Sequence, residues 1–180
     1  LAIERFYDPA EELFFYTDEA DPALIVRKKE LFDNVITSSN SIMAVNLRIL
    51  GALTYREEFD KLARQMIGKM AKLLTQDIRH LSNWAYASLL FMEPLAEVGI
   101  IGPESMEFGV ALQREYMPAR VVAASNVPGA VPLLKNKVAV NGRSTIYVCF
   151  DKTCKLPVHS IDEALKQILD KNTTQYRQHT

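Results

Sequence analysis

The chain has 180 residues, of which 48% are hydrophobic and 24% charged, and its formal net charge is −1. This composition is typical of a globular protein that buries enough apolar surface to fold without disulfides or metal. A near-neutral chain lacks the basic excess that attracts nucleic acid or an anionic membrane surface. No apolar run approaches the roughly 20 residues that span a bilayer. We therefore expect neither a nucleic-acid partner nor a membrane partner.

Aromatic and extended segments open the chain. Ile3, Phe6 and Tyr7 have the spacing of the end of a helix, and the chain has neither an initiator Met nor a signal-peptide pattern. We therefore expect a fragment of a longer chain. The segments that follow are predicted as a short strand or extended arm at 13–17, a loop at 18–22 and a second extended piece at 23–27.

The stretch TSSNS, from Thr37 to Ser41, stands directly before a long apolar run and has two interpretations. Serine and asparagine side chains accept hydrogen bonds from the free N–H groups of a first helical turn, so the stretch is a candidate helix cap. Carboxylate, amide and hydroxyl groups also suit sugar hydroxyls in a cavity. The spacing favours capping, and the two roles are compatible. The four candidate ligand-binding residues are Asp33, Asn34, Ser38 and Asn40.

Three amphipathic helices are predicted next, at 41–53, 57–74 and 82–92. Ser82 or Asn83 is the expected cap of the third helix, because both residue types accept hydrogen bonds from a first turn. Sequential amphipathic helices with short connections imply antiparallel hairpins. The residues that we expect to be buried in the third helix are Trp84, Leu89 and Phe91.

The pattern changes near residue 95 from helical periodicity to β-α-β. The predicted elements are a strand at 96–101, a helix at 104–116, a strand at 120–124, extended pieces at 138–140 and 145–150 around the turn dipeptide Asn141-Gly142, and a helix at 161–169. The two strands that flank the 104–116 helix should pair in parallel through a right-handed crossover. On that helix Met106, Val110 and Leu112 should lie near one face. Ser160 should cap the last helix, with Glu163 completing a capping box.

Two cysteines, Cys149 and Cys154, are too few for a secreted disulfide scaffold, which favours two reduced thiols in a cytoplasmic protein. A local disulfide or a redox pair is the alternative. A metal site with His159 lacks a fourth ligand. The turn Gly102-Pro103-Glu104 lacks the further glycines and free N–H groups that bind phosphate. We expect no metal and no cofactor, and the sequence assigns no catalytic residue.

Several stretches together resemble a known family. They are FYDPAEELFFYTDE, LIVRKKELFDNVITSSNSIMAVNL, SNWA and YVCFDKTCKLPV. They are similar to the C-terminal part of thioredoxin-domain proteins of the spermatogenesis-associated type. Members of that family carry an N-terminal thioredoxin-like domain and an (α/α)6 barrel similar to N-acylglucosamine 2-epimerase and six-hairpin glycosidases. The resemblance extends over nearly the whole chain to about Leu169.

The resemblance implies that the chain is the tail of a protein several times longer, with the thioredoxin domain and most of the barrel outside it. Thr37 stands where the family usually has Pro, and Tyr16 replaces an Asp that many members carry, which weakens a catalytic role at that position. The residues that match the family pattern around the polar stretch are Asp33, Asn34, Ser38, Asn40 and Ser41.

We therefore predict an α+β fold: α-helical hairpins from the end of an (α/α) toroid at 1–94, packed with a small α/β unit at 95–169 and followed by a polar tail at 170–180. The first functional hypothesis is a carbohydrate-like ligand bound by the intact protein, with this fragment inactive alone. The second is a non-catalytic module that docks a protein partner or the thioredoxin domain of its own chain. Redox work by the two cysteines is a third. Apolar helix faces left without neighbouring hairpins predict that the fragment self-associates.

Overall fold

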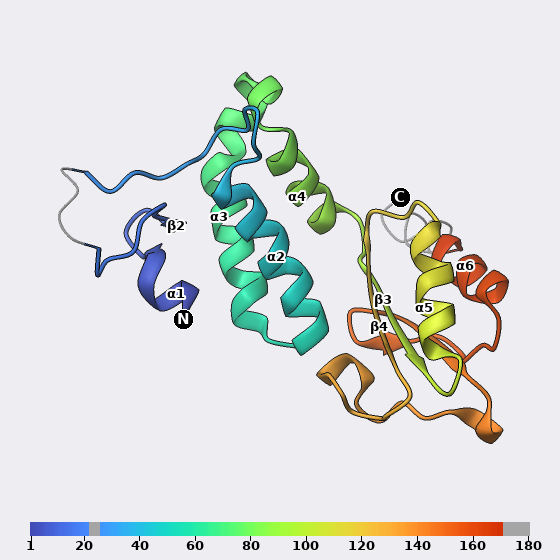
Figure 1. The fold of residues 1–180 in the computed structure, drawn as a ribbon. Helices are drawn as coiled ribbons and strands as arrows, with labels where there is room; N and C mark the ends of the chain where they lie inside the picture. The colour runs from blue at the N-terminus through green and yellow to red at the C-terminus, as the bar shows by residue number, and fades with distance from the viewer. Residues whose placement is uncertain (22–25, 171–180) are drawn as a thin grey trace. The chain divides into compact units, whose positions relative to one another are not determined.

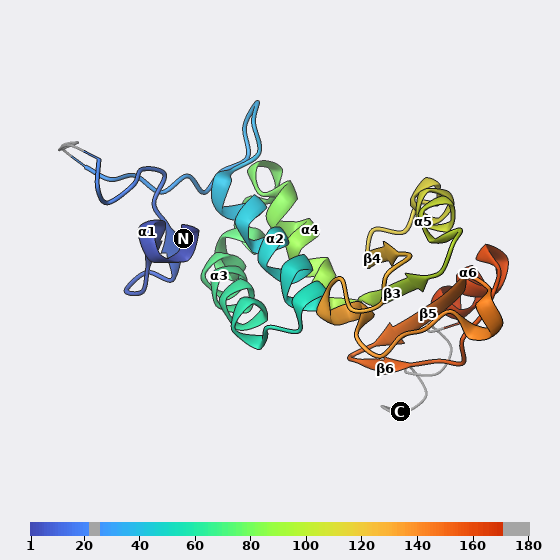
Figure 2. The same cartoon turned by 60° about the horizontal axis from the view of Figure 1, so that its bottom comes forward.

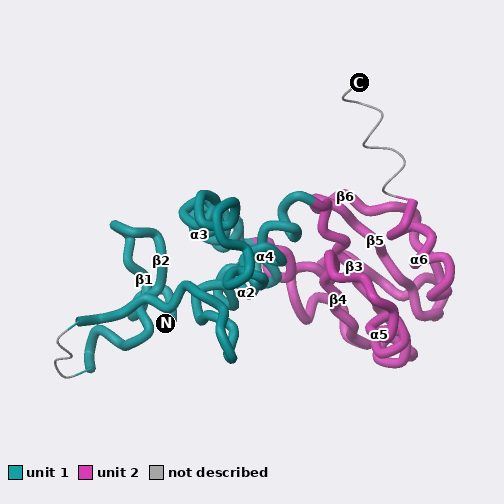
Figure 3. Tube along the Cα trace, turned by 90° about the horizontal axis from the view of Figure 1, so that it is seen from above, with its two compact units in different colours: residues 1–51, 56–92 teal, residues 52–55, 93–180 magenta. Residues whose placement is uncertain are grey.

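The structure is a computed structural model that describes residues 1–21 and 26–170, and these residues form an α+β protein. Two compact units make up the chain (Figures 1 and 3). Unit 1 contains residues 1–51 and 56–92, and unit 2 contains residues 52–55 and the chain from residue 93 onwards. The predicted α+β class is confirmed. Most of the extended piece predicted at 23–27 and nearly all of the tail predicted at 170–180 lie outside the described residues.

Unit 1 is built on a helical hairpin and one further helix. Helix α2, Ser39–Thr54, and helix α3, Glu57–Gln76, run side by side, and α4, Ser82–Met92, follows a 3-10 turn, η1, at Ile78–His80 (Figure 1). Each observed helix agrees with its prediction to within two residues at both ends. Buried side chains from all three helices form one core. Its members include Ala44, Leu47, Ala63, Met66, Met70, Trp84 and Ala87.

The buried face of α4 differs from the prediction at Leu89, and Phe91 is half-buried and packs against the unit 1 core. Trp84 is fully buried, as expected, but 53% of Leu89 is exposed and its neighbour Leu90 is buried. Five helical residues turn the chain through about 500°, so Leu89 lies about 140° away from Trp84 around the helix. The prediction that Leu89 is buried was therefore wrong.

A short N-terminal arm packs against this core. Helix α1, Ala2–Phe6, leads into strand β1, Tyr7–Asp8, which pairs antiparallel with β2, Leu13–Phe14. Leu13 and Phe14 are only 6% and 4% exposed and belong to the unit 1 core. The aromatic segment predicted as a strand or an arm thus contributes a two-residue strand.

Unit 2 contains a four-stranded mixed sheet in the order β4-β3-β5-β6 (Figure 2). Strand β3, Ala96–Ile101, pairs in parallel with β4, Arg120–Ser125, as predicted. On its other side β3 pairs antiparallel with β5, Thr145–Phe150, and β5 pairs with the short strand β6, Thr153–Cys154. The sheet is therefore parallel on one side of β3 and antiparallel on the other.

Two helices cover one face of this sheet. Helix α5, Ser105–Arg114, connects β3 to β4, and helix α6, Ile161–Leu169, follows β6. Their buried side chains meet alternate residues of β3 and β5, as the period of two along a strand requires. This second core contains Ala96, Val98, Ile100, Leu112, Ile146, Val148, Ala164 and Ile168.

The opposite face of the sheet lies against irregular structure. The segment between β4 and β5 contains two 3-10 turns, η2 at Pro132–Leu134 and η3 at Val140–Gly142. The extended piece predicted at 138–140 does not form a strand, because the free edge of β3 is taken by β5. Side chains satisfy its backbone instead: the Val140 N–H donates to Thr145 Oγ1, and the Tyr147 hydroxyl donates to the Val138 carbonyl oxygen.

The two cysteines form a disulfide across the β5–β6 hairpin, Cys149–Cys154. The two positions are direct partners in the antiparallel register. The preference for two reduced thiols was therefore wrong, and the local disulfide that the sequence left open is the observed state. Sequence separation alone did not reveal the pairing, since it depends on the tight turn between β5 and β6.

Candidate functional site

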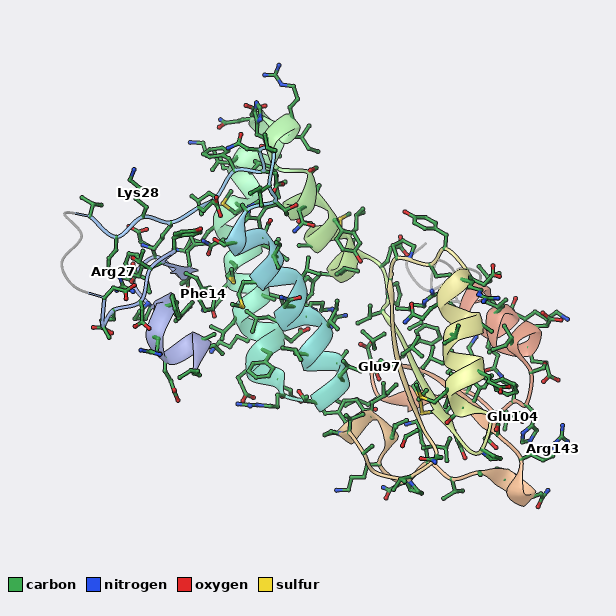
Figure 4. All side chains as sticks on the ribbon, viewed as in Figure 1. Phe14, Arg27, Lys28, Glu97, Glu104 and Arg143 are labelled. Carbon is green, nitrogen blue, oxygen red and sulfur yellow. A yellow bond between two sulfur atoms is a disulfide. The ribbon has the colours of Figure 1, made fainter. Side chains whose placement is uncertain are left out.

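Asn40 is a fully buried side chain that binds the backbone of a distant residue. Its Oδ1 accepts from the Phe14 N–H at 2.7 Å, and its Nδ2 donates to the Phe14 carbonyl oxygen at 2.8 Å. The same Nδ2 also donates to the Glu30 carbonyl oxygen. Phe14 is labelled beside the helices of unit 1 in Figure 4. Asn40 therefore satisfies both polar backbone groups of Phe14 in β2, as a neighbouring strand would do.

Asp33 joins the starts of two helices. One carboxylate oxygen accepts from the Ser38 N–H at 2.9 Å, and the other accepts from the Asn83 N–H at 2.8 Å in the first turn of α4. Ser38 Oγ in turn accepts from the Ser41 N–H in the first turn of α2. The cap of α4 is thus Asp33, not Ser82 or Asn83, and the two bonded residues lie 50 positions apart in the chain.

The structure brings three of the four candidate ligand-binding residues together. Asp33, Ser38 and Asn40 are buried and bonded to groups of their own unit, whereas Asn34 is exposed. Sequence reasoning identified the capping role and named Asn83 as a cap of its own helix, but it missed the contact in which Asn83 Nδ2 donates to the Ser41 hydroxyl. These contacts support the capping interpretation. Ligand binding by the four residues stays a prediction.

A shallow apolar hollow lies on the outer side of α5. It has a volume of about 390 Å³ and is lined by Met106, Glu107, Val110, Ala111 and Arg114. We call these five residues the α5 surface. Met106 and Val110 are 64% and 54% exposed, while Leu112 is fully buried. Two residues turn a helix by about 200°, so Val110 and Leu112 face opposite ways and the prediction of one shared face was wrong.

The charged residues of the α5 surface have no ion pair with any described residue. Glu107 and Arg114 are both exposed and seven positions apart, which is about two helical turns. They therefore lie on the same side of the helix as Val110, one before it and one after it. The opposite side of α5 is fixed to the sheet: a Cβ on Gly109 would lie 3.2 Å from the Ala124 Cβ.

The buried carboxyl of Glu97 lies beside the disulfide. Both are on the face of the sheet that is not covered by α5 and α6. Glu97 of β3 is the register partner of Cys149 in β5, and Cys149 is the partner of Cys154 in β6. Direct partners point to the same face, with Cβ atoms about 5 Å apart. Glu97 and Cys149 are 7% and 0% exposed, whereas Cys154 is exposed. Glu97 is labelled on unit 2 in Figure 4.

Lys137 is a buried cation that interacts electrostatically with this carboxyl. Burial lowers the pKa of the Lys137 ammonium, and the Glu97 carboxylate raises it in part. Lys137 is 7% exposed, and its side chain crosses the sheet over Gly99. A Cβ on Gly99 would lie 2.7 Å from Lys137 Cδ, so a larger residue at that position would displace the Lys137 side chain.

His159 does not join the cysteines. Its Nδ1 lies 3.0 Å from the Ser144 carbonyl oxygen. Within residues 1–21 and 26–170 no group of three or more His, Cys, Asp or Glu side chains is placed to hold a metal ion. In the same part of the chain no helix has the length and hydrophobicity needed to cross a membrane.

Comparison with known proteins adds no family assignment. No protein-family model matches the chain, and no curated protein matches it. The resemblance to thioredoxin-domain proteins of the spermatogenesis-associated type therefore stays a prediction.

Proposed function

We propose that the chain is a non-catalytic protein-interaction module that associates through the α5 surface with a second copy of itself. The observation that carries the proposal is the exposure of Met106 and Val110 on a helix whose opposite side is buried in the unit 2 core. Exposed apolar side chains that adjoin one another and are bordered by polar residues mark contact surfaces.

The charge pattern favours a second copy as the partner. In a twofold symmetric contact each residue meets its counterpart in reversed order. If two α5 helices pack antiparallel with the axis between Val110 and Ala111, Glu107 of each copy lies opposite Arg114 of the other. Val110 and Ala111 of the two copies then fill the centre of the contact. Both charges, which lack an ion pair with any described residue, gain one in the same arrangement.

The size of the surface sets the expected affinity. The ten residues of α5 extend over about 15 Å, so the contact is smaller than the standard protein interface. We therefore expect a weak dimer, with a dissociation constant above about 1 μM. The sequence predicts self-association through apolar helix faces of residues 1–94. The proposal adds a second, specific contact, the α5 surface.

Charge exchange at the α5 surface tests the proposal. Glu107→Arg and Arg114→Glu should each weaken the dimer by about tenfold in sedimentation equilibrium, and the double variant should restore it, because opposite charges then face each other again. Val110→Asp should abolish association, since it places a charge at the centre of the contact.

Leu156→Asp is the matched control, because Leu156 is likewise an exposed apolar residue of unit 2 but is not one of the residues of the α5 surface. Dimerisation that is lost in the control but kept in Val110→Asp would contradict the proposal. A wild-type chain that is monomeric at millimolar concentration would also contradict the proposal. A protein partner that still binds Val110→Asp would show that the chain docks partners through a surface other than the α5 surface. We also propose a cytoplasmic location, although the reduced thiols from which the sequence predicted it are not observed: Cys149 and Cys154 form a disulfide, which in the cytosol is usually transient or redox-active.

A further inference from the structure

We propose that Cys149–Cys154 is a thiol–disulfide exchange site that reacts with an external thiol, with Glu97 as the proton acceptor for Cys149. The inference is independent of the α5 surface. It rests on the placement of the two sulfur atoms and of one buried carboxyl in a single row across β3, β5 and β6.

The two sulfur atoms differ in access. Cys154 is exposed on the short edge strand β6, whereas Cys149 is completely buried in β5. Thiol–disulfide exchange requires the attacking thiolate to reach one sulfur in line with the bond that breaks. An external thiolate can therefore attack Cys154 Sγ, and Cys149 is the leaving group.

The exchange balances with an external monothiol as reductant. The thiolate RS⁻ forms a bond to Cys154 Sγ, the Cys149–Cys154 bond breaks, and Cys149 leaves as a thiolate that takes up one proton. A second thiolate then attacks the mixed disulfide and releases RSSR, which leaves Cys154 reduced. In the reverse direction the Cys149 thiol loses its proton, attacks the mixed disulfide at Cys154 and expels RS⁻.

Glu97 is placed to take that proton. A buried thiol ionises poorly because burial disfavours its charged form. The Glu97 side chain occupies the register position directly opposite Cys149, and its Oε2 accepts from the Lys152 N–H within the same hairpin at 3.3 Å. Two further titratable groups, Lys137 and Tyr55, interact electrostatically with Glu97, so the proton acceptor is identified by the position of the carboxylate and not by these charges. The carboxylate therefore offers a proton acceptor that bulk water cannot supply at this depth.

The fold does not depend on the disulfide to hold the hairpin. Outside the turn, the Lys155 N–H donates to the Val148 carbonyl oxygen, and Ile146 and Val158 exchange two further backbone hydrogen bonds. The disulfide closes a loop with a sequence separation of 5, and short loops gain the least from such a link. Opening the bond therefore leaves the surrounding sheet paired, as a reversible site requires.

The pH dependence of disulfide closure tests the role of Glu97. The reduced chain is mixed with oxidised glutathione, and closure is followed by alkylation and mass spectrometry between about pH 6 and 9. Glu97→Gln should slow closure by about tenfold or more and shift its rate profile to higher pH, because the thiol then has to lose its proton to solvent.

Asp151→Asn is the matched control, since Asp151 is an exposed carboxyl of the same hairpin. It should leave the rate profile unchanged. Identical profiles for Glu97→Gln and Asp151→Asn would overturn the assignment of Glu97.

Single-cysteine variants test the sulfur asymmetry even if Glu97→Gln does not fold. Cys149→Ser should form a mixed disulfide with oxidised glutathione at Cys154 at least about tenfold faster than Cys154→Ser does at Cys149. Equal rates would overturn the inference. A wild-type disulfide that dithiothreitol reduces only under unfolding conditions would overturn it as well.

Discussion

At the scale of single residues, Asn40 shows how a side chain replaces a strand. Strand β2 has only two residues, so it cannot satisfy its own polar groups through a long ladder. The amide of Asn40 presents one donor and one acceptor at the spacing of a peptide group, and it binds the N–H and the carbonyl oxygen of Phe14. The N-terminal arm is therefore fixed to the first turn of α2.

Asn40→Ala should lower the free energy of unfolding by about 3 kcal/mol, because it leaves two buried backbone groups of Phe14 without partners. Denaturant unfolding followed by circular dichroism measures the change. Asn46→Ala is the control: Asn46 is exposed on the same helix, so its replacement should change stability by less than about 0.5 kcal/mol. Equal stabilities of the two variants would refute the role of Asn40.

The sequence revealed the residue types of this network but not their partners. A run of serine and asparagine before an apolar helix predicts capping, and Ser38 does accept from the first turn of α2. The contact between Asp33 and the start of α4 joins residues 50 positions apart. No local pattern encodes such a contact, since it exists only after the hairpin has folded.

At the scale of elements, α6 behaves as its local sequence predicts. Ser160 Oγ accepts from the Glu163 N–H, and the Glu163 carboxylate accepts from the Ser160 hydroxyl and from the His159 N–H. These hydrogen bonds lower the pKa of the Glu163 carboxyl, and the bond from the Ser160 hydroxyl has the largest effect. These hydrogen bonds confirm the predicted capping box. The sequence could predict it because all of the bonded residues lie within four positions of one another.

Ser160→Ala should lower the free energy of unfolding by about 1 kcal/mol at neutral pH. A lowered pKa in the folded state adds stability above the unfolded pKa of about 4.3, and this stability is lost as pH falls through the folded value. The loss of stability on acidification should therefore be smaller in Ser160→Ala. Asn126→Ala is the control, because Asn126 is an exposed polar residue just after β4. Parallel pH–stability curves for the wild type and Ser160→Ala would contradict the prediction.

Helix α5 shows where local reasoning failed. The pattern of apolar residues placed Met106, Val110 and Leu112 together, yet the sheet selects the side that carries Leu112 and Gly109. Gly109 allows the helix to approach Ala124 closely. The close contact between Gly109 and Ala124 determines which side of α5 is buried and which side is exposed. The sequence alone does not specify that contact.

At the scale of the whole molecule, residues 1–21 and 26–170 form two hydrophobic cores, one in each unit. One joins α2, α3, α4 and the N-terminal arm, and the other joins the β3–β5 sheet to α5 and α6. The carbohydrate hypothesis concerns the first unit, where three of its four residues are already bonded within the protein. An (α/α) toroid and the longer family protein stay predictions at this scale.

Hydrogen exchange of the intact protein with a panel of monosaccharides tests the carbohydrate hypothesis, which concerns a ligand bound by the intact protein. We expect exchange at residues 34–37 to be unchanged by any sugar, because the side chains of Asp33, Ser38 and Asn40 already bind groups of unit 1. The amides of α5 provide the internal reference. Slowing by about tenfold or more at 34–37 alone would favour the carbohydrate hypothesis instead.

The sequence by itself determined the helices, three of the four strands of the unit 2 sheet and the cap at Ser160, because these depend on hydrophobic period and on contacts within a few residues. Only the tertiary structure decided the roles of Asp33 and Asn40, the side of α5 that remains exposed, and the row of Glu97, Cys149 and Cys154. Each of these depends on which strands and helices become neighbours. That choice is made by packing across long stretches of chain, so it leaves no signature in the local pattern.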